Sequence, residues 1–232
     1  MELKNKVAIV TGVSKGIGKS IVDSLLESGM KVAGWGRTNS DTKHENYSFF
    51  KTDITKFESV HQSYESSIEK FGSIDILINN AGLGIFKLLE KISLEDWDKM
   101  YHTNVNGLFY CCKKVIPSMK SGKSGHIVNI SSIAGLTGIP EGTAYCGTKH
   151  AVRGISHSLY KELRKFNIKV SCVYPGSVNT EFFENYEGVT ANESMLNPND
   201  IADVVLNILK APENALTVDV EIRPINPVYN PG

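Results

Sequence analysis

Three residues, Ser132, Tyr145 and Lys149, have the types and the spacing that general acid/base chemistry requires. Tyr145 and Lys149 lie four positions apart in a helical pattern that begins near Thr143, so their side chains stand one turn apart on one face. A lysine ammonium favours the phenolate and lowers the pKa of a tyrosine from its usual value of about 10. The Ser132 hydroxyl can hydrogen-bond the oxygen that gains or loses the proton. Together the three suit proton transfer on a carbonyl/alcohol pair.

A tyrosine and a lysine four apart also occur by chance, so the surrounding elements decide the matter. Residues 127–130 form a short apolar run that predicts a buried strand, and Ser132 comes just after it. A loop with glycine and proline breakers follows, and then the helix of Tyr145 begins. Open α/β sheets place their chemistry where strand ends face helix starts.

A second chemical signal lies near the start of the chain, where residues 6–11 predict a strand. Gly12, Gly16 and Gly18 follow it, and the apolar positions after them have helical spacing. A strand, a glycine-rich turn and a helix form a dinucleotide-binding arrangement, because the backbone approaches a pyrophosphate and the helix start offers free N–H groups. The spacing differs from G-x-G-x-x-G, and the alternative is a plain turn between a strand and a helix.

The end of the second predicted strand, residues 31–35, favours a phosphorylated cofactor. Folds that bind NAD usually carry an acid here for the ribose 2′-hydroxyl. This chain has no acid and instead has Arg37, whose guanidinium matches a 2′-phosphate in geometry and charge. Lys15 in the glycine turn adds a second cation. Both favour NADP(H); the alternative is that both are solvated surface residues.

The rest of the chain alternates strand and helix patterns. Helices are predicted at 55–71, 94–119, 143–165 and 198–210, the first of them with a capping box formed by Thr55 and Glu58. Further strands are predicted at 47–52, 74–78, 169–173 and 216–222. This alternation predicts an α/β fold with a parallel sheet, and without a linker or repeat we expect one domain over residues 1–232.

Composition excludes several classes of protein. The 232 residues carry 25 Lys+Arg and 25 Asp+Glu, a balance that argues against a nucleic-acid binder or a binder of anionic membranes. The sequence has no apolar run of the roughly 18 residues that a spanning helix needs. The four cysteines have neither a C-x-x-C pair nor zinc spacing, so we expect no metal site and reduced thiols. Without a signal-peptide pattern, a cytoplasmic protein is expected.

These motifs stand in one order, and over residues 5–223 the chain resembles the single-domain branch of the short-chain dehydrogenase/reductase family. The T-G-x-x-x-G-x-G motif matches Thr11 to Gly18, N-N-A-G matches Asn79 to Gly82, and Y-x-x-x-K matches Tyr145 to Lys149. The resemblance implies a Rossmann-type doubly wound parallel sheet of about seven strands with helices on both faces. It also implies NADP(H) contacts from a set of turn and strand-end residues: Gly12, Ser14, Lys15, Gly16, Ile17, Gly18, Arg37, Asp53, Ile54, Asn80, Ala81, Gly82, Tyr145, Lys149, Pro175, Gly176, Val178 and Thr180.

The resemblance assigns roles to the catalytic residues. Tyr145 would be the general acid in carbonyl reduction and the base in alcohol oxidation, and Ser132 would stabilise the substrate oxygen. Lys149 would lower the tyrosine pKa and hold the nicotinamide ribose. Asn104 would keep a water in a proton relay with Lys149. Alternatively, Asn104 is a helix-bend residue whose side chain satisfies freed backbone groups.

The substrate is expected to be a small ketone, aldehyde or secondary alcohol. Ser132, Tyr145 and Phe86 are the predicted substrate contacts, beside the loop 134–142 and a lid at about 177–197. The lid aromatics Phe182, Phe183 and Tyr186 favour an apolar substrate, although core packing explains them equally well.

Two alternative functions stay open. One is a 3-oxoacyl thioester reductase, which the final strand does not favour because it lacks the usual Gly-Gly. The other is a non-catalytic NADP(H)-binding regulator. A regulator would be free to lose catalytic residues, and this chain keeps all four.

The two long predicted helices carry more apolar residues than one sheet-facing stripe needs. Excess apolar surface usually marks an interface, and the related family pairs these two helices in a four-helix contact. We therefore expect a homodimer or homotetramer with Phe109 and Leu159 near the interface, and with the small Gly154 allowing close helix approach. The alternative is that this surface is core.

Overall fold

A seven-stranded parallel sheet forms the centre of the molecule in the computed structural model, which describes residues 2–183 and 191–227. The strand order is β3-β2-β1-β4-β5-β6-β7, so the chain winds outward from β1 in both directions. The strands are β1 Val7–Thr11, β2 Lys31–Gly36, β3 Tyr47–Lys51, β4 Ile76–Asn79, β5 Gly125–Ile130, β6 Ile168–Pro175 and β7 Asp219–Ile222. The predicted doubly wound, Rossmann-type sheet is confirmed.

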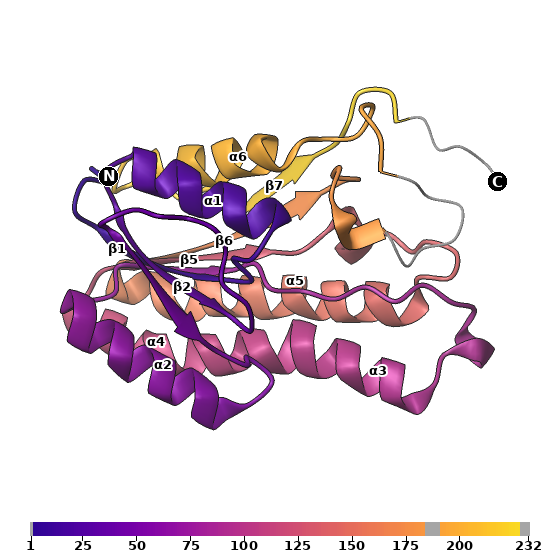
Figure 1. The fold of residues 1–232 in the computed structure, drawn as a ribbon, viewed down its shortest axis with the longest axis horizontal. Helices are drawn as coiled ribbons and strands as arrows, with labels where there is room; N and C mark the ends of the chain where they lie inside the picture. Colours follow the sequence, from indigo (N-terminus) through magenta and orange to yellow (C-terminus); the bar gives the residue numbers. More distant parts are fainter. Residues whose placement is uncertain (1, 184–190, 228–232) are drawn as a thin grey trace.

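Helices cover both faces of this sheet. Figure 1 shows α1 and α6 above it and α2, α4 and α5 below it. The helices are α1 Gly16–Glu27, α2 Phe57–Phe71, α3 Leu94–Tyr101, α4 Gly107–Gly122, α5 Thr143–Leu163 and α6 Pro198–Lys210. Two hydrophobic clusters form the core, one between the sheet and helices α1 and α6, and the other between the sheet and helices α2, α4 and α5.

Strand β1 shows how the sequence specifies this layering. All five of its residues are buried, as expected for a parallel strand covered on both faces. Val7 and Ile9 enter the cluster of α2, α4 and α5, whereas Ala8 and Val10 enter the cluster of α1 and α6. The period of two along a strand therefore supplies both cores from one short segment.

The predicted capping box at Thr55 is wrong. Helix α2 begins at Phe57, and the preceding Lys56 makes no side-chain cap. The backbone N–H and the hydroxyl of Thr55 both donate to the Asp53 carboxylate, at 3.0 and 2.7 Å. Thr55 therefore lies one residue before the N-cap position, in a local turn with Asp53, and does not cap the helix.

The predicted helix over residues 94–119 is interrupted. Helix α3 ends at Tyr101, a π-helical turn spans His102–Asn106, and α4 continues to Gly122. The start was predicted correctly, since Ser93 accepts a hydrogen bond from the Asp96 N–H at 3.0 Å. Elsewhere the main differences are at the last strand, which begins at Asp219 rather than near 216, and at α5, which ends in a 3-10 turn at Arg164–Phe166.

The described helices include none with the length and apolar character to cross a membrane. All four cysteines are free and buried in the core.

Candidate active site

A cleft with a volume of about 1710 Å³ lies at the carboxyl ends of the strands. The residues that follow β1 to β6 contribute to it, as expected for an open α/β sheet. Every residue predicted to contact the cofactor lines this cleft, and so do Ser132 and Phe86. Asn104 is the exception among the predicted site residues and lines a smaller cavity beneath.

The serine, tyrosine and lysine meet at the end of β5. Lys149 is only 6% exposed; its Nζ donates to the carbonyl oxygen of Ile130 at 3.0 Å and lies 5.7 Å from the centre of the Tyr145 ring. The Ser132 side chain lies close enough to the phenol of Tyr145 to lower its pKa by hydrogen bonding, and its Oγ accepts from the Ala134 N–H at 3.1 Å. The spacing thus predicted correctly which side chains gather.

The electrostatics of this group differ from the expectation. Burial raises the pKa of Tyr145, and the hydrogen bond with Ser132 opposes that rise. Burial also lowers the pKa of Lys149 to about 8. The expected lowering of the tyrosine pKa by Lys149 is not found, because removal from water penalises the charged form of both groups.

Asn104 lies in the π-helical turn and connects three segments. Its Oδ1 accepts from the Leu83 N–H at 2.8 Å, and its Nδ2 donates to the Leu83 carbonyl at 2.7 Å and to Thr148 Oγ1 at 3.0 Å. The amide therefore satisfies the backbone of the loop after β4, not the freed groups of its own helix. It remains close to Lys149, because a Cβ built on Gly82 would lie 3.6 Å from both Asn104 Oδ1 and Lys149 Nζ.

The smaller cavity lies between Asn104 and Lys149 and measures about 10 Å³, close to what one water needs. Asn79 also lines it. Among the described side chains, Asn79 Oδ1 is a buried oxygen without a hydrogen-bond partner. The residues therefore fit a relay water at this position.

The glycine turn and the N-N-A-G segment hold one another in place. Asn80 Nδ2 donates to the carbonyls of Thr11 and Gly12, at 2.9 and 3.1 Å, and Thr11 Oγ1 accepts from the N–H groups of Asn80 and Ala81. Gly12 has a φ of +73°, and a Cβ there would lie 2.8 Å from the Ala81 Cα. A Cβ on Gly18 would lie 2.0 Å from the Gly12 carbonyl. The turn therefore requires glycine and leaves its backbone open to the cleft.

Arg37, the residue predicted to hold a 2′-phosphate, lines the far end of the cleft together with Asp53. Burial alone would raise the pKa of Asp53, but hydrogen bonds from Thr55 and the positive charges of Lys56 and Arg37 lower it below its usual value. Arg37 therefore acts electrostatically across this end of the cleft.

Lys15, the second predicted cation, forms an ion pair with Glu181. Sequence reasoning missed this glutamate, because the two residues lie far apart in the chain and no local pattern connects them.

Aromatic rings enclose Tyr145 at the substrate end. Phe86 lies 5.2 Å from the Tyr145 ring, and Phe182 lies 5.7 Å from it. The predicted contact at Phe86 is therefore beside the catalytic group. The lid is described at residues 177–183 and 191–197, and the prediction for Tyr186 and for the Phe183 side chain lies outside the described residues. The cleft also includes lining residues that were not predicted, among them Thr38, Leu83 and Thr103.

Fold and site together define the class of protein, a Rossmann-type oxidoreductase. The family model for short chain dehydrogenases matches residues 6–188, and the chain belongs to that family. It is 36% identical over 235 residues to an uncharacterized oxidoreductase of Staphylococcus saprophyticus, an alignment that covers 97% of this chain and 100% of that relative.

Solved structures with the same fold include two nicotinamide complexes. An alcohol dehydrogenase from the archaeon Thermococcus sibiricus, complexed with 5-hydroxy-NADP, has a TM-score of 0.87 and 28% identity, covering 97% of this chain and 100% of that one. A 3-ketoacyl-(acyl-carrier-protein) reductase from Brucella melitensis, complexed with NADH, has a TM-score of 0.88 and 26% identity, covering 95% and 97%.

Proposed function

We propose that the chain is a cytoplasmic NADP(H)-dependent oxidoreductase that transfers a hydride between the nicotinamide and a small ketone, aldehyde or secondary alcohol. The observation that carries the proposal is the meeting of Ser132, Tyr145 and Lys149 in the same cleft as the glycine turn. Proton exchange and cofactor contact can then occur side by side.

The glycine turn fits a dinucleotide. Glycines stand at the positions where a Cβ would collide with neighbouring backbone, so no side chain covers the turn. The turn leads into the N-terminus of α1, whose free N–H groups favour a pyrophosphate. When bound, the nicotinamide supplies or accepts the hydride.

The chain's own residues would handle the proton. Tyr145 would give its phenolic proton to the carbonyl oxygen in reduction, while Ser132 hydrogen-bonds the same oxygen. Lys149 would stabilise the phenolate left on the tyrosine, and the anionic cofactor nearby would favour its ammonium form. A water between Asn79, Asn104 and Lys149 would return the proton.

The preference for NADP(H) rests on Arg37 and Lys15, both of which line the cleft. The similar structures include one complex with 5-hydroxy-NADP and one with NADH, so they do not distinguish between the two cofactors. The preference therefore rests on the residues of this chain. The end of β2, residues 34–38, has Arg37 and no acid, which favours a 2′-phosphate, and Lys15 adds a cation that is paired with Glu181.

A panel of ketones, aldehydes, alcohols and acyl thioesters, assayed with NADPH and NADH by nicotinamide absorbance, tests the function. Turnover of a simple carbonyl with NADPH, lost in Tyr145→Phe, supports it. A preference for acyl thioesters identifies the 3-oxoacyl thioester reductase instead, and NADPH binding without turnover of any compound identifies a regulator.

A further inference from the structure

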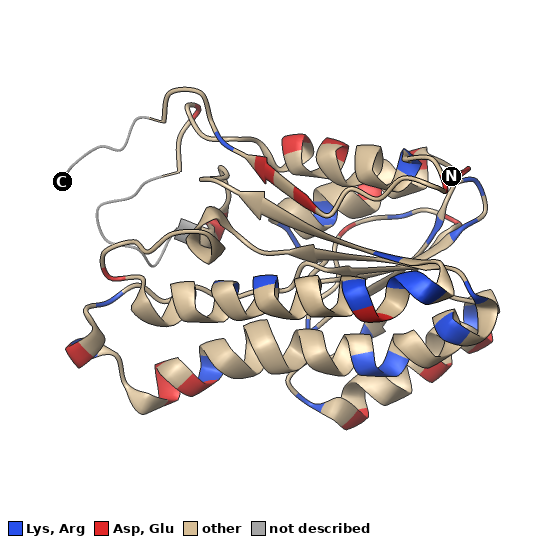
Figure 2. Cartoon of the chain, turned by 180° about the vertical axis from the view of Figure 1, so that it is seen from behind, with Lys and Arg blue, Asp and Glu red and all other residues tan. Residues whose placement is uncertain are grey.

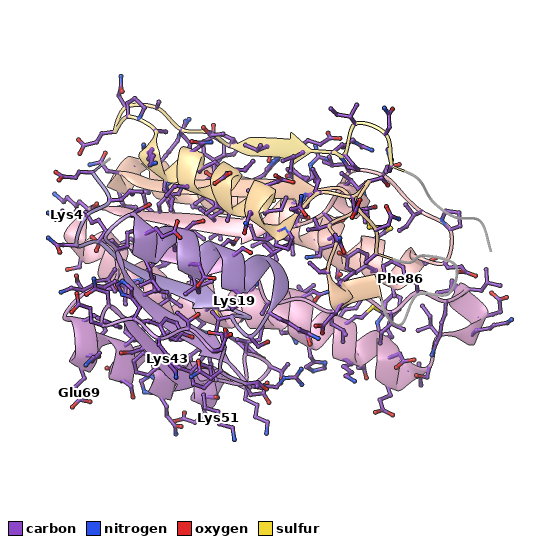
Figure 3. The ribbon with its side chains drawn as sticks, turned by 45° about the horizontal axis from the view of Figure 1, so that its top comes forward. Lys4, Lys19, Lys43, Lys51, Glu69 and Phe86 are labelled. Atoms are coloured by element: carbon purple, nitrogen blue, oxygen red, sulfur yellow. The ribbon has the colours of Figure 1, made fainter. Side chains whose placement is uncertain are left out.

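Three aromatic rings meet at the reactive end of the cleft. Phe86 comes from the connection after β4, Tyr145 from α5, and Phe182 from the 3-10 turn Glu181–Phe183. Their centroids are 5.2 Å apart for Phe86 and Tyr145, 5.7 Å for Tyr145 and Phe182, and 6.2 Å for Phe86 and Phe182. Figure 3 shows Phe86 beside the short orange turn that precedes the grey segment. The catalytic phenol therefore has an aromatic wall on two sides.

Gly84 allows this arrangement. A Cβ built there would lie 2.5 Å from Cζ of Phe182 and 3.0 Å from Cε2 of Phe86. Any side chain at this position would push the Phe182 ring away, since the obstructing atoms are the far end of a rotatable side chain. The glycine is thus a steric requirement of the ring contacts, not of a turn.

Ser132 and Lys149 lie beside Tyr145, and the three rings also pack within an apolar cluster. Leu83, Ile85 and Ile139 pack against the same cluster as Tyr145. The ion pair of Lys15 with Glu181 lies at the base of the Phe182 turn, and the carboxylate there already has a partner. Arg37 and Asp53 act on one another at the adenosine end.

We infer that Phe86 and Phe182 determine substrate specificity and select carbonyl compounds with a flat, apolar substituent, such as aryl ketones, over anionic or polyhydroxylated carbonyls. An aryl substituent of the substrate can make aromatic contacts with Phe86 and Phe182 of the same kind as the rings make with one another. A carboxylate or a polyol would lose its water against apolar walls. The inference rests on the proposed function, since it concerns the same site.

Kinetic constants for acetophenone, acetone and pyruvate test this specificity in the parent chain, Phe182→Ala and Gly84→Ala. The parent should prefer acetophenone to pyruvate by at least tenfold. Both variants should lose about 3–10-fold in kcat/KM for acetophenone, the size of an aromatic contact, mainly through KM, and little for acetone. Phe57→Ala removes a 40% exposed ring at the start of α2 that does not line the cleft, and serves as the matched control. Equal losses for acetophenone and acetone, or a parent preference for pyruvate, would overturn the inference.

Saturation-transfer NMR with the NADP⁺-loaded protein separates this inference from the proposed function. Transfer to the acetophenone ring protons, weaker in Phe182→Ala and absent for pyruvate, supports the aromatic subsite even if no carbonyl is reduced. Equal transfer to both compounds, or none to acetophenone, contradicts the subsite even if turnover is found. If Phe182→Ala does not fold, the same weaker transfer to the acetophenone ring protons is expected for Gly84→Ala.

Discussion

Lys149 Nζ donates a hydrogen bond to the carbonyl oxygen of Ile130, the last residue of β5, at 3.0 Å. The bond connects the second turn of α5 to the carboxyl end of β5, beside Ser132 and Tyr145. It also keeps an ammonium group in a nearly dry position, since Lys149 is buried. Burial lowers the pKa of Lys149 to about 8, so the cofactor-free protein carries an energetic cost at this residue.

Replacing that lysine should stabilise the cofactor-free protein. Below about pH 8 the native chain holds a charged lysine out of water; between about pH 8 and 10.5 the unfolded chain binds more protons, so stability rises with pH. A difference of one in pKa between the folded and unfolded chains corresponds to about 1.4 kcal/mol in the free energy of unfolding. The Ile130 carbonyl loses a donor, at a cost of about 1–3 kcal/mol, so Lys149→Met should gain about 1–2 kcal/mol near pH 7.

Urea unfolding without cofactor, near pH 7 and near pH 10, measures this effect. The gain should shrink at the higher pH. Lys161→Met, an exposed position on the same helix, should change stability by less than about 0.5 kcal/mol. A Lys149→Met protein that is less stable than the parent at both pH values would show that the hydrogen bond outweighs the buried charge.

Tyr145→Phe should abolish turnover while keeping the cofactor. The change removes the transferable proton but preserves the ring contacts with Phe86 and Phe182. Loss of acid/base catalysis typically costs at least about two orders of magnitude. Turnover and NADPH fluorescence titration report the two effects separately, with Tyr160→Phe on the same helix as the control. Retained reductase activity would remove Tyr145 from the assigned role.

Arg37→Ala should weaken NADPH binding far more than NADH binding, since losing one partner of a close charge pair costs about 2–5 kcal/mol. Lys15→Ala should have a smaller effect, because the Lys15 ammonium is already paired with Glu181 and must exchange one anion for another. Dissociation constants of both cofactors for the parent and the two variants test this order. Equal affinities of the parent for NADPH and NADH would refute the preference.

The sequence predicted the sheet and the gathering of the site because both depend on local patterns. Buried strands such as β1 are short β-branched runs, and a spacing of four places Tyr145 and Lys149 on one helix face. The strand ends of a parallel sheet lie at one edge, so Ser132 had to lie near the glycine turn.

What could not be predicted depends on contacts between distant segments. The apolar spacing runs through residues 102–106 without a break, yet the chain forms a π turn there. The amide of Asn104 bonds Leu83 and Thr148, which lie 21 and 44 positions away. Similarly, the spacing of Tyr145 and Lys149 indicates that they are neighbours but does not report their burial, and burial decides the direction of both pKa shifts.

The homodimer or homotetramer expected from the long helices remains a proposal. The residues that suggested it differ in their exposure in the structure. Leu108 and Cys112 are buried in the core of this chain, whereas Phe109 is 49% exposed and Leu159 is partly buried. Residues 107–112 of α4 and residues 154–160 of α5 carry no Lys, Arg, Asp or Glu, and Figure 2 draws both helices with long tan stretches. This face fits a second copy of the chain better than it fits water.

Gly154 offers a variant that tests the dimer without disturbing the fold. A Cβ at Gly154 would meet no atom within 4 Å, so Gly154→Glu should fold normally, but a charged side chain there would block close approach of a second α5. Gly122, at the end of α4, has the same open surroundings and provides the control Gly122→Glu. Light scattering at micromolar concentration should find a dimer or tetramer for the parent and for Gly122→Glu, and a smaller species for Gly154→Glu. A parent chain that is monomeric and active would show that the apolar stripe of α4 and α5 belongs to the core alone.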